Sequence, residues 1–326
     1  MGRPGLTGGD LGLAVRPATL DDVPRLFELV SAIDQHDFGE VDMTLAEVRD
    51  DMAELDLDHD SWLVTSVGSS DAPLVAFAAV ERQGEGESEY RGQVSVHPDW
   101  RRRGVGSALA ERLEASVRER LEPGSDDETP LLGFMKGDSP QLRWAERLGF
   151  AWARRFQRMR IELDGPTPDP EWPDGITLRD FVPGKDDRAM YEAQEAAFSD
   201  HWGHVTRTFE EWSKRLDRSD FDPGLWHLAL DGDQVVATTS NSTLPDGVGW
   251  VSGLGVIASH RRRGLARAIL LHSFGVFWQR GMQAVALGVD SESLTGATRL
   301  YESVGMRVVQ QYDQVRKLVR YSTSTE

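Results

Sequence analysis

Two short sequences combine arginine with small residues in a spacing that suits the binding of an anion. Each separates a strand-like sequence from a helix-like one. The first amides of a helix lack intrahelical acceptors and lie at the positive end of its dipole, so small residues there let a phosphate approach. The flanking arginines add charge suited to a pyrophosphate. The residues are Arg101, Arg102, Arg103, Gly104, Val105 and Gly106 in the first, and Arg261, Arg262, Arg263, Gly264, Leu265, Ala266 and Arg267 in the second.

Taken alone, one such run fits a tight strand-to-helix turn with a solvated basic cluster as well as it fits an anion-binding site. Neither run contains the Gly-Lys-Ser/Thr of a nucleotide-binding P-loop. The two copies, however, lie in a repeat. Gly104 and Gly264 are separated by nearly the same length of chain as Gly149 and Gly305, which is close to half of the sequence. A period this long indicates duplication of a whole domain. The duplication favours the interpretation that each run is an anion cradle, a turn whose helix amides bind a phosphate, over that of a solvated turn.

The segment 164–175 carries four prolines, which interrupt both helices and strands. We interpret it as a semi-rigid linker. The sequence therefore predicts a flexible tail at 1–12, an N-terminal domain at 13–163, the linker, and a C-terminal domain at 176–321.

Each half has the same order of predicted elements. A strand, at about 14–17 or 176–179, leads into helices near 21–33 and 44–55, or 186–197 and 208–217. Three strand-like runs follow, and the last of them enters the arginine run and a helix with 3.6-residue periodicity. A buried strand, a short helix and final strands close each half. This order predicts an α/β fold.

At these residues the chain resembles the GNAT acetyltransferase superfamily. Both arginine runs match its acyl-CoA motif, Q/R-x-x-G-x-G/A, and the resemblance covers about 13–163 and 174–320. It implies two tandem domains, each a splayed mixed β-sheet with helices on both faces. The tandem arrangement is also similar to actinobacterial two-domain acetyltransferases of the mycothiol synthase type.

The resemblance implies that acetyl-CoA is the co-substrate and that its pyrophosphate lies on the arginine-glycine turn. It further implies that the strand before the turn pairs its backbone with the pantetheine arm. The strand residues concerned are Leu254, Gly255 and Val256 in the second half, and Val94, Ser95 and Val96 in the first.

Acetyl transfer to an amine needs a base for the ammonium proton and an acid for the departing thiolate. Many members of the family use a tyrosine on the last helix as this acid. The resemblance implies the same role for Tyr301, which lies four residues before Gly305. Ala145 stands at the equivalent place in the first half. We therefore expect the first half to bind acetyl-CoA without turning it over. The alternative for Tyr301 is an aromatic ring packed on the sheet.

The base is less well specified. The strand position that supplies a glutamate in some relatives is Trp250 here. Candidates then fall in the loop after the first helix of the second half, where Asp200, His201, Trp202 and His204 are expected to border the acceptor. Histidine has a suitable intrinsic pKa, but ordinary loop polarity or a water chain to bulk remain open. Two histidines three residues apart do not define a metal site, so no metal is expected.

The glycines at 253 and 255 fit G-x-G-x-x-A, but they lie within a strand rather than after it, so a dinucleotide site is rejected. A bulge or splay of that strand is the better interpretation.

Composition excludes several classes of protein. Lys and Arg number 36 against 54 Asp and Glu, a net charge of −18, which disfavours nucleic-acid binding. The chain has no cysteine, so disulfides and thiolate chemistry are absent. No apolar run is long enough for a membrane span, and the N-terminus lacks a signal-peptide pattern. We expect a cytoplasmic protein and leave its oligomeric state open.

The favoured function is an acetyl-CoA-dependent N-acetyltransferase acting on a small amine. The negative charge favours a cationic acceptor. One alternative is acetylation of a cysteinyl amine, as in mycothiol synthase. Another is a non-catalytic acetyl-CoA-binding sensor, which the presence of Tyr301 disfavours.

Overall fold

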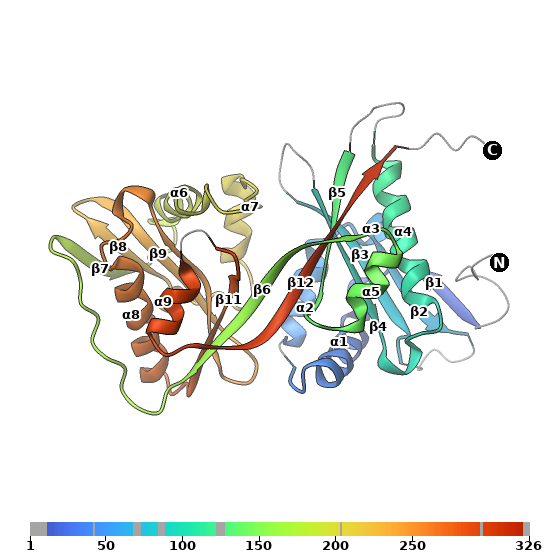
Figure 1. The fold of residues 1–326 in the computed structure, drawn as a ribbon, viewed down its shortest axis with the longest axis horizontal. Coiled ribbons are helices and arrows are strands. Elements are labelled where there is room, and N and C mark those ends of the chain that lie inside the picture. The colour runs from blue at the N-terminus through green and yellow to red at the C-terminus, as the bar shows by residue number, and fades with distance from the viewer. Residues whose placement is uncertain are drawn as a thin grey trace. The chain divides into compact units, whose positions relative to one another are not determined.

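The structure is a computed structural model that describes residues 12–41, 43–67, 73–83, 89–121, 128–202, 204–293 and 296–321. The chain divides into two compact units (Figure 1). Unit 1 comprises residues 1–153 and 313–326, and unit 2 comprises residues 154–312. Most of the predicted N-terminal tail, residues 1–11, lies outside the described residues.

Unit 1 follows the predicted order of strands and helices. Its elements are β1 (Leu13–Arg16), α1 (Val23–Asp37), α2 (Leu45–Ala53), α3 (Leu57–Asp60), β2 (Ser61–Ser66), β3 (Ala76–Gln83), β4 (Glu89–Val96), α4 (Val105–Glu119), β5 (Glu128–Lys136), α5 (Pro140–Arg147), the first three residues of β6 (Ala151–Glu162) and the last eight of β12 (Arg307–Arg320).

The sheet of unit 1 runs β1-β2-β3-β4-β5-β12. β1 to β4 are antiparallel, whereas β4 and β5 are parallel and, among the described residues, pair at Tyr90 with Leu131 and Arg91 with Leu132. The two strands therefore pair near their beginnings and separate toward their ends. One apolar core packs α4 against this sheet, and a second packs α1 and α2 against it.

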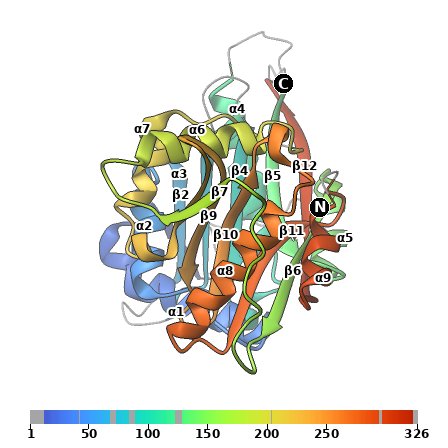
Figure 2. The same cartoon turned by 90° about the vertical axis from the view of Figure 1, so that its left-hand side faces the viewer.

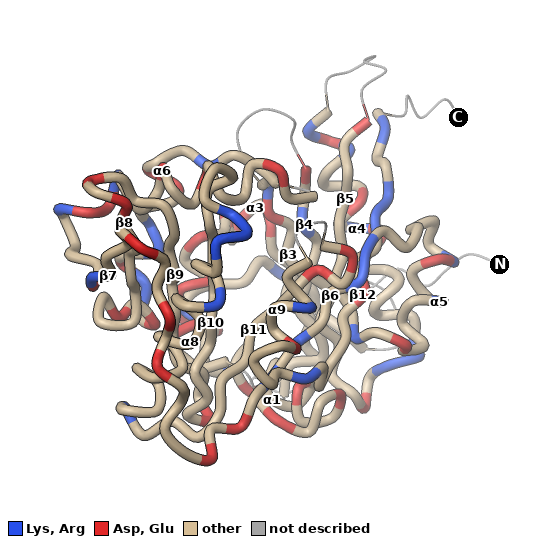
Figure 3. Tube along the Cα trace, turned by 60° about the vertical axis from the view of Figure 1, so that its left-hand side comes forward, with Lys and Arg blue, Asp and Glu red and all other residues tan. Residues whose placement is uncertain are grey.

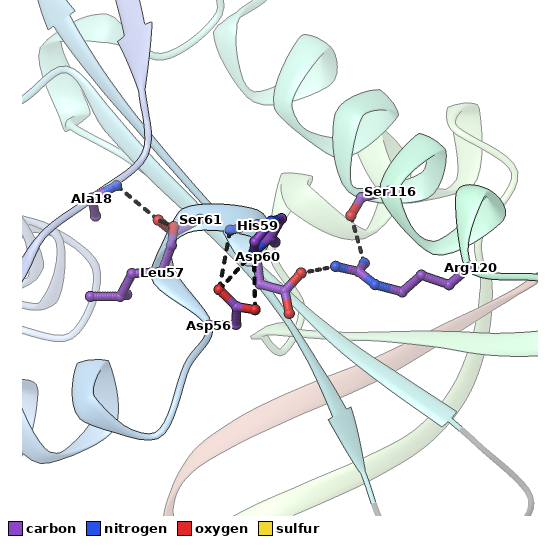
Figure 4. A network of polar contacts seen from close by, with 8 residues as sticks. All are labelled: Ala18, Asp56, Leu57, His59, Asp60, Ser61, Ser116 and Arg120. Atoms are coloured by element: carbon purple, nitrogen blue, oxygen red, sulfur yellow. Dashed lines mark hydrogen bonds and ion pairs between the residues drawn. The ribbon is translucent and has the colours of Figure 1, made fainter.

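The start of β2 is held by a network of polar contacts (Figure 4). The Ser61 hydroxyl donates to the Leu57 carbonyl at 2.6 Å and accepts from the Ala18 amide at 2.8 Å. Asp60 forms an ion pair with Arg120, at the end of α4, and Arg120 also donates to the Ser116 hydroxyl. The network joins α3, β2 and the C-terminal end of α4.

Unit 2 repeats this order. Its elements are the rest of β6, β7 (Ile176–Asp180), α6 (Asp187–Phe198), α7 (Phe209–Ser213), β8 (His227–Asp231), β9 (Gln234–Thr243), β10 (Gly249–Val256), α8 (Leu265–Gln279), β11 (Ala284–Asp290), α9 (Ala297–Ser303) and the first six residues of β12. The predicted mixed α/β fold, present twice in the same order, is confirmed.

Helices cover both faces of the unit 2 sheet, in which β11, β10, β9, β8 and β7 are neighbours in that order (Figures 1 and 2). Val256 packs with Leu265 of α8. The neighbouring Gly255 faces the other way, where a Cβ would lie 2.8 Å from the Cβ of Ala197 in α6. Adjacent strand residues point to opposite faces, so α6 and α8 lie on opposite sides of β10. Glycine at 255 lets α6 lie this close.

The division into units differs from the predicted boundary in the placement of two strands. The strand residues 154–162 were predicted to close the N-terminal domain, but they pair with β11 in unit 2. Residues 313–320 instead belong to unit 1, next to β5. Ladder hydrogen bonds form with any strand that lies alongside, so chain order alone does not decide which sheet a terminal strand joins. Residues 163–175, which include the proline-rich segment, contain no helix or strand.

None of the described helices is long and apolar enough to cross a membrane. Acidic residues are spread over elements of both units (Figure 3).

Candidate active site

The two arginine-glycine turns have nearly identical backbones. Gly264 precedes α8 with φ +90°, and Gly104 precedes α4 with φ +88°. Arg262 and Arg102 both have φ +61°, which L-residues rarely adopt. Neither glycine offers a side chain to cap its helix, and a Cβ at Gly264 or Gly104 would meet nothing within 4 Å, so the first-turn amides of α8 and α4 lack a side-chain cap at the positive end of the helix. This geometry fits an anion such as a pyrophosphate.

The first arginine of each run is held by the protein. The Nε of Arg261 donates to the Val256 carbonyl at 3.1 Å, and the guanidinium forms a two-pronged ion pair with Asp200. Arg101 repeats both contacts, with the Val96 carbonyl at 3.2 Å and with Asp37 at 2.7 and 2.8 Å. These two arginines therefore fix the turn, and the charge that faces solvent comes from the exposed residues that follow.

The exposed basic residues are Arg102, Arg103, Arg262, Arg263 and Arg267. Arg103 stacks over the Trp100 ring, with Cζ 4.7 Å from the centroid, and Arg263 lies 3.6 Å from Asp231.

β10 leaves one edge open along the residues predicted to pair with the pantetheine arm. In the described part of the chain β10 pairs with β11 only from Gly249 to Val251. Leu254, Gly255 and Val256 pair with β9 on the other side, and the register shifts between Val251 and Gly253. The predicted bulge at these glycines is confirmed. Beyond it, the backbone groups that face away from β9, apart from the Val256 carbonyl that Arg261 binds, are available to an extended ligand.

The loop after α6 lies across the ends of the two separating strands. Asp200 binds Arg261 after β10, and Trp202 stacks on Arg154, whose Cζ is 4.7 Å from the ring centroid. Arg154 in turn donates to Asp290 at the end of β11 at 2.8 and 3.0 Å. The loop is thus attached at both sides of the opening between β10 and β11, with His201 between the two attachments.

His201 is half-buried, and its ring lies edge-on to Phe198 with centroids 4.8 Å apart. Burial lowers the pKa of His201 below its usual value, with smaller opposing contributions from Asp200 and Asp290. The imidazole is therefore neutral at pH 7 and able to accept a proton. By contrast, the hydrogen bonds from Arg261 lower the pKa of Asp200, which makes that carboxylate a poor base.

His204 is oriented by a carboxylate, because its Nε2 lies 3.1 Å from Glu195 Oε2 on α6. Gly203, between the two histidines, lies outside the described residues. Trp250 packs against β11 and β6, with ring atoms 3.8–3.9 Å from the Cβ position of Gly288 and Arg158 5.4 Å above its centroid. An aromatic ring, and no carboxylate, therefore stands at this position of β10.

Tyr301 lies on α9 in the core of unit 2, in the cluster that also contains Leu287 and Phe274. Burial raises the pKa of its hydroxyl to about 12, so it stays protonated at neutral pH. Its hydroxyl makes no hydrogen bond to a described residue, which leaves the proton available to a ligand. In unit 1 the equivalent Ala145 is buried and has no proton to give.

Several of these contacts were not predicted from the sequence, namely those of Arg154 with Trp202 and Asp290 and of His204 with Glu195. The pairs Asp37–Arg101 and Asp200–Arg261 did leave a signal. Their acidic members recur at almost the same spacing along the chain as the two arginine runs. Among the described residues no group of three metal-ligating side chains occurs.

Comparison with known proteins places these features in a family. A mycothiol acetyltransferase from Thermomonospora curvata is 37% identical over 216 residues, which cover 66% of this chain and 69% of the relative. The chain belongs to the GNAT acetyltransferase family. Profiles of GNAT acetyltransferase domains match residues 61–151 and 188–306, one in each half. A mycothiol acetyltransferase from Geodermatophilus obscurus is 32% identical over 246 residues, 73% of this chain and 76% of the relative.

Solved structures agree. A GCN5-related N-acetyltransferase from Sphaerobacter thermophilus has a TM-score of 0.77 at 36% identity, over 94% of this chain and 96% of that one. A tandem GNAT protein from the clavulanic acid biosynthesis pathway has a TM-score of 0.72 at 16% identity, covering 95% and 99%, which shows a shared fold.

The expected tandem GNAT architecture is confirmed, as is its likeness to mycothiol synthase. This GNAT protein is an acyltransferase that uses acetyl-CoA as co-substrate.

Proposed function

We propose that unit 2 moves the acetyl group of acetyl-CoA directly to the primary amine of a small, cationic acceptor. The observation that carries the proposal is the opening between β10 and β11. It leads from the turn at Gly264 and is crossed by the loop that holds His201.

The pyrophosphate of acetyl-CoA would be held by the first amides of α8, with charge from Arg262, Arg263 and Arg267. Arg261 positions this turn through Val256 and Asp200. The pantetheine arm would lie along Leu254–Val256, because the described pairing of β10 with β11 ends at Val251 and, on that side, only the Val256 carbonyl is bound, by Arg261. Glycine at 264 is required by its φ of +90°.

In the reaction the amine nitrogen attacks the thioester carbonyl carbon, the C–S bond breaks, and the sulfur leaves as a thiolate. His201 takes the proton that the amine loses, since its lowered pKa keeps it neutral. The Tyr301 hydroxyl donates a hydrogen bond to the departing sulfur. Its pKa of about 12 lies above the roughly 8.5 of a thiol, so it stabilises the thiolate chiefly through a hydrogen bond.

The charge around the opening supports a cationic acceptor. On the β11 side, the carboxylates of Asp290 and Glu292 share the single guanidinium of Arg154, which leaves one negative charge in excess, while Arg261 neutralises Asp200. Trp202, 46% exposed, adds an aromatic face that suits an alkylammonium group. The net charge of −18 attracts cations at longer range.

A second candidate is acetylation of a cysteinyl amine, which the names of the mycothiol acetyltransferase relatives favour. A non-catalytic acetyl-CoA sensor is disfavoured by the buried, protonated Tyr301.

The test is a panel of amines assayed for release of free thiol from acetyl-CoA, with the products identified by mass. The chain has no cysteine, so a thiol-reactive dye meets no protein background, and for the cysteinyl amine, whose own thiol reacts with the dye, turnover is followed by mass detection of the N-acetyl product. The panel contains a diamine, a neutral primary amine of matched length and a cysteinyl amine. Preference for the diamine supports the proposal, and preference for the cysteinyl amine selects the second candidate. If acetyl-CoA binds but none of the three amines is acetylated, or if the neutral amine is preferred, the proposed cationic acceptor is wrong.

A further inference from the structure

Unit 1 carries the same arginine-glycine turn as unit 2, but a tryptophan lies against it. The indole nitrogen of Trp144, on α5, donates to the Ser107 hydroxyl in the first turn of α4 at 2.9 Å. The Cζ2 atom of the same ring is 3.6 Å from the Cβ position of Gly106. The ring therefore lies flush with the start of the helix whose amides form the cradle.

The same point of α4 faces the strand that would hold a pantetheine arm. The Cβ position of Gly106 lies 3.5 Å from Val96 and 4.0 Å from Val94, both on β4. β4 has parted from β5 by these residues, since the described pairing of the two strands ends at Arg91. Trp144 thus stands where the helix start and the separating strand meet.

Unit 2 differs at the two equivalent positions. Five residues before the glycine that follows the last helix, unit 1 has Trp144 and unit 2 has Leu300. At the second small position of the motif, unit 1 has Gly106 and unit 2 has Ala266. The larger side chain on one element goes with the smaller residue on the other, so glycine at 106 gives the Trp144 ring room to lie against the start of α4.

The loop across the separating strands is also fastened in unit 1. Asp37 is bound by Arg101, and its carbonyl accepts a hydrogen bond from Lys136 at the end of β5. The Lys136 ammonium lies 5.3 Å from the centroid of Phe38. Phe38 takes the place of His201, since each directly follows the aspartate that binds the first arginine of its run.

We propose that Trp144 occupies the path of the acyl arm in unit 1, so that the chain binds one acetyl-CoA, in unit 2. This inference rests on the proposed location of acetyl-CoA at the turn before α8. To admit an arm, the indole must leave Gly106, break its hydrogen bond with Ser107 and expose apolar surface. These losses weaken binding to unit 1 by roughly 100-fold or more. The inference reverses our expectation that the first half binds acetyl-CoA.

The experiment is a calorimetric titration of the full chain with acetyl-CoA. We expect one equivalent for the native chain, none for Gly264→Glu, and one for Gly104→Glu. Trp144→Leu, which copies Leu300, should raise the number to two. The control Trp152→Leu removes a 43% exposed tryptophan of the same unit, whose indole nitrogen donates to Asp313 rather than to α4, and should leave one equivalent. Melting curves establish that each variant is folded.

Two equivalents in the native chain, falling to one in Gly104→Glu, would overturn the inference. So would a Trp144→Leu variant that is folded and still binds one equivalent, or a gain of binding in Trp152→Leu. These outcomes do not depend on which amine is acetylated, so failure of the proposed reaction is distinguishable from failure of this inference.

Discussion

Replacing Tyr301 by phenylalanine keeps the buried ring and removes only the hydroxyl. No described residue hydrogen-bonds that hydroxyl, so the folded state loses no hydrogen bond and we expect a melting temperature within a few degrees of native. The catalytic loss follows from the pKa of about 12. Complete proton transfer to a thiolate of pKa about 8.5 is uphill by about 3.5 units, so the hydroxyl acts mainly as a hydrogen-bond donor. A hydrogen bond to a charged group contributes about 1.5–3 kcal/mol, so turnover should fall roughly 10- to 100-fold, near the lower limit for acid catalysis.

The assay measures turnover at saturating acetyl-CoA and acceptor, together with acetyl-CoA affinity by calorimetry. We expect kcat to fall while the dissociation constant changes less than about threefold. The pH–rate profile of the native chain should show no limb from Tyr301 between pH 6 and 10, because the hydroxyl is protonated throughout this range. Unchanged kcat in the variant would remove Tyr301 from the mechanism. A parallel loss of binding and folding would make it a packing residue.

Three further outcomes are expected. Gly264→Glu puts a carboxylate on a residue with φ +90° beside the cradle amides, so acetyl-CoA binding should vanish in calorimetry, and retained micromolar binding would move the site elsewhere. His201→Gln should abolish the acidic limb of the kcat profile, which lies below pH 6.5 because burial lowers the pKa of His201; an unchanged limb would assign it to another group. Burial lowers the pKa of His227 to about 3. Between pH 6.5 and 3, His227 is therefore protonated in the unfolded chain but not in the folded chain. Stability should fall by up to roughly 4 kcal/mol between pH 6.5 and 3, and urea titrations of His227→Phe should show a shallower fall, whereas equal slopes would exclude His227.

The sequence alone determined the features that depend on local backbone geometry. A glycine before a helix, with arginines around it, has few conformations that suit it, and both turns adopt the one that opens the helix amides at Gly104 and Gly264. The repeated order of elements and the bulge at Gly253 were likewise readable, because periodicity and glycine placement act over a few residues. Tyr301 was recognised from its distance to Gly305, and the roles of these site residues remain proposals.

Other features were decided only by tertiary structure, because they depend on which distant side chains meet. Arg261 was expected to face a phosphate, but Asp200 and the Val256 carbonyl lie within reach and bind it in the folded chain. The attachment of Trp202 to Arg154 joins residues that are far apart in the sequence, and no spacing rule predicts it. The sheets that residues 154–162 and 313–320 join were also decided by tertiary structure, because backbone hydrogen bonds form with whichever strand lies alongside. The contact of the Trp144 ring with Gly106 and Ser107 likewise depends on how α5 packs against α4, so the sequence alone does not show whether a side chain covers the cradle.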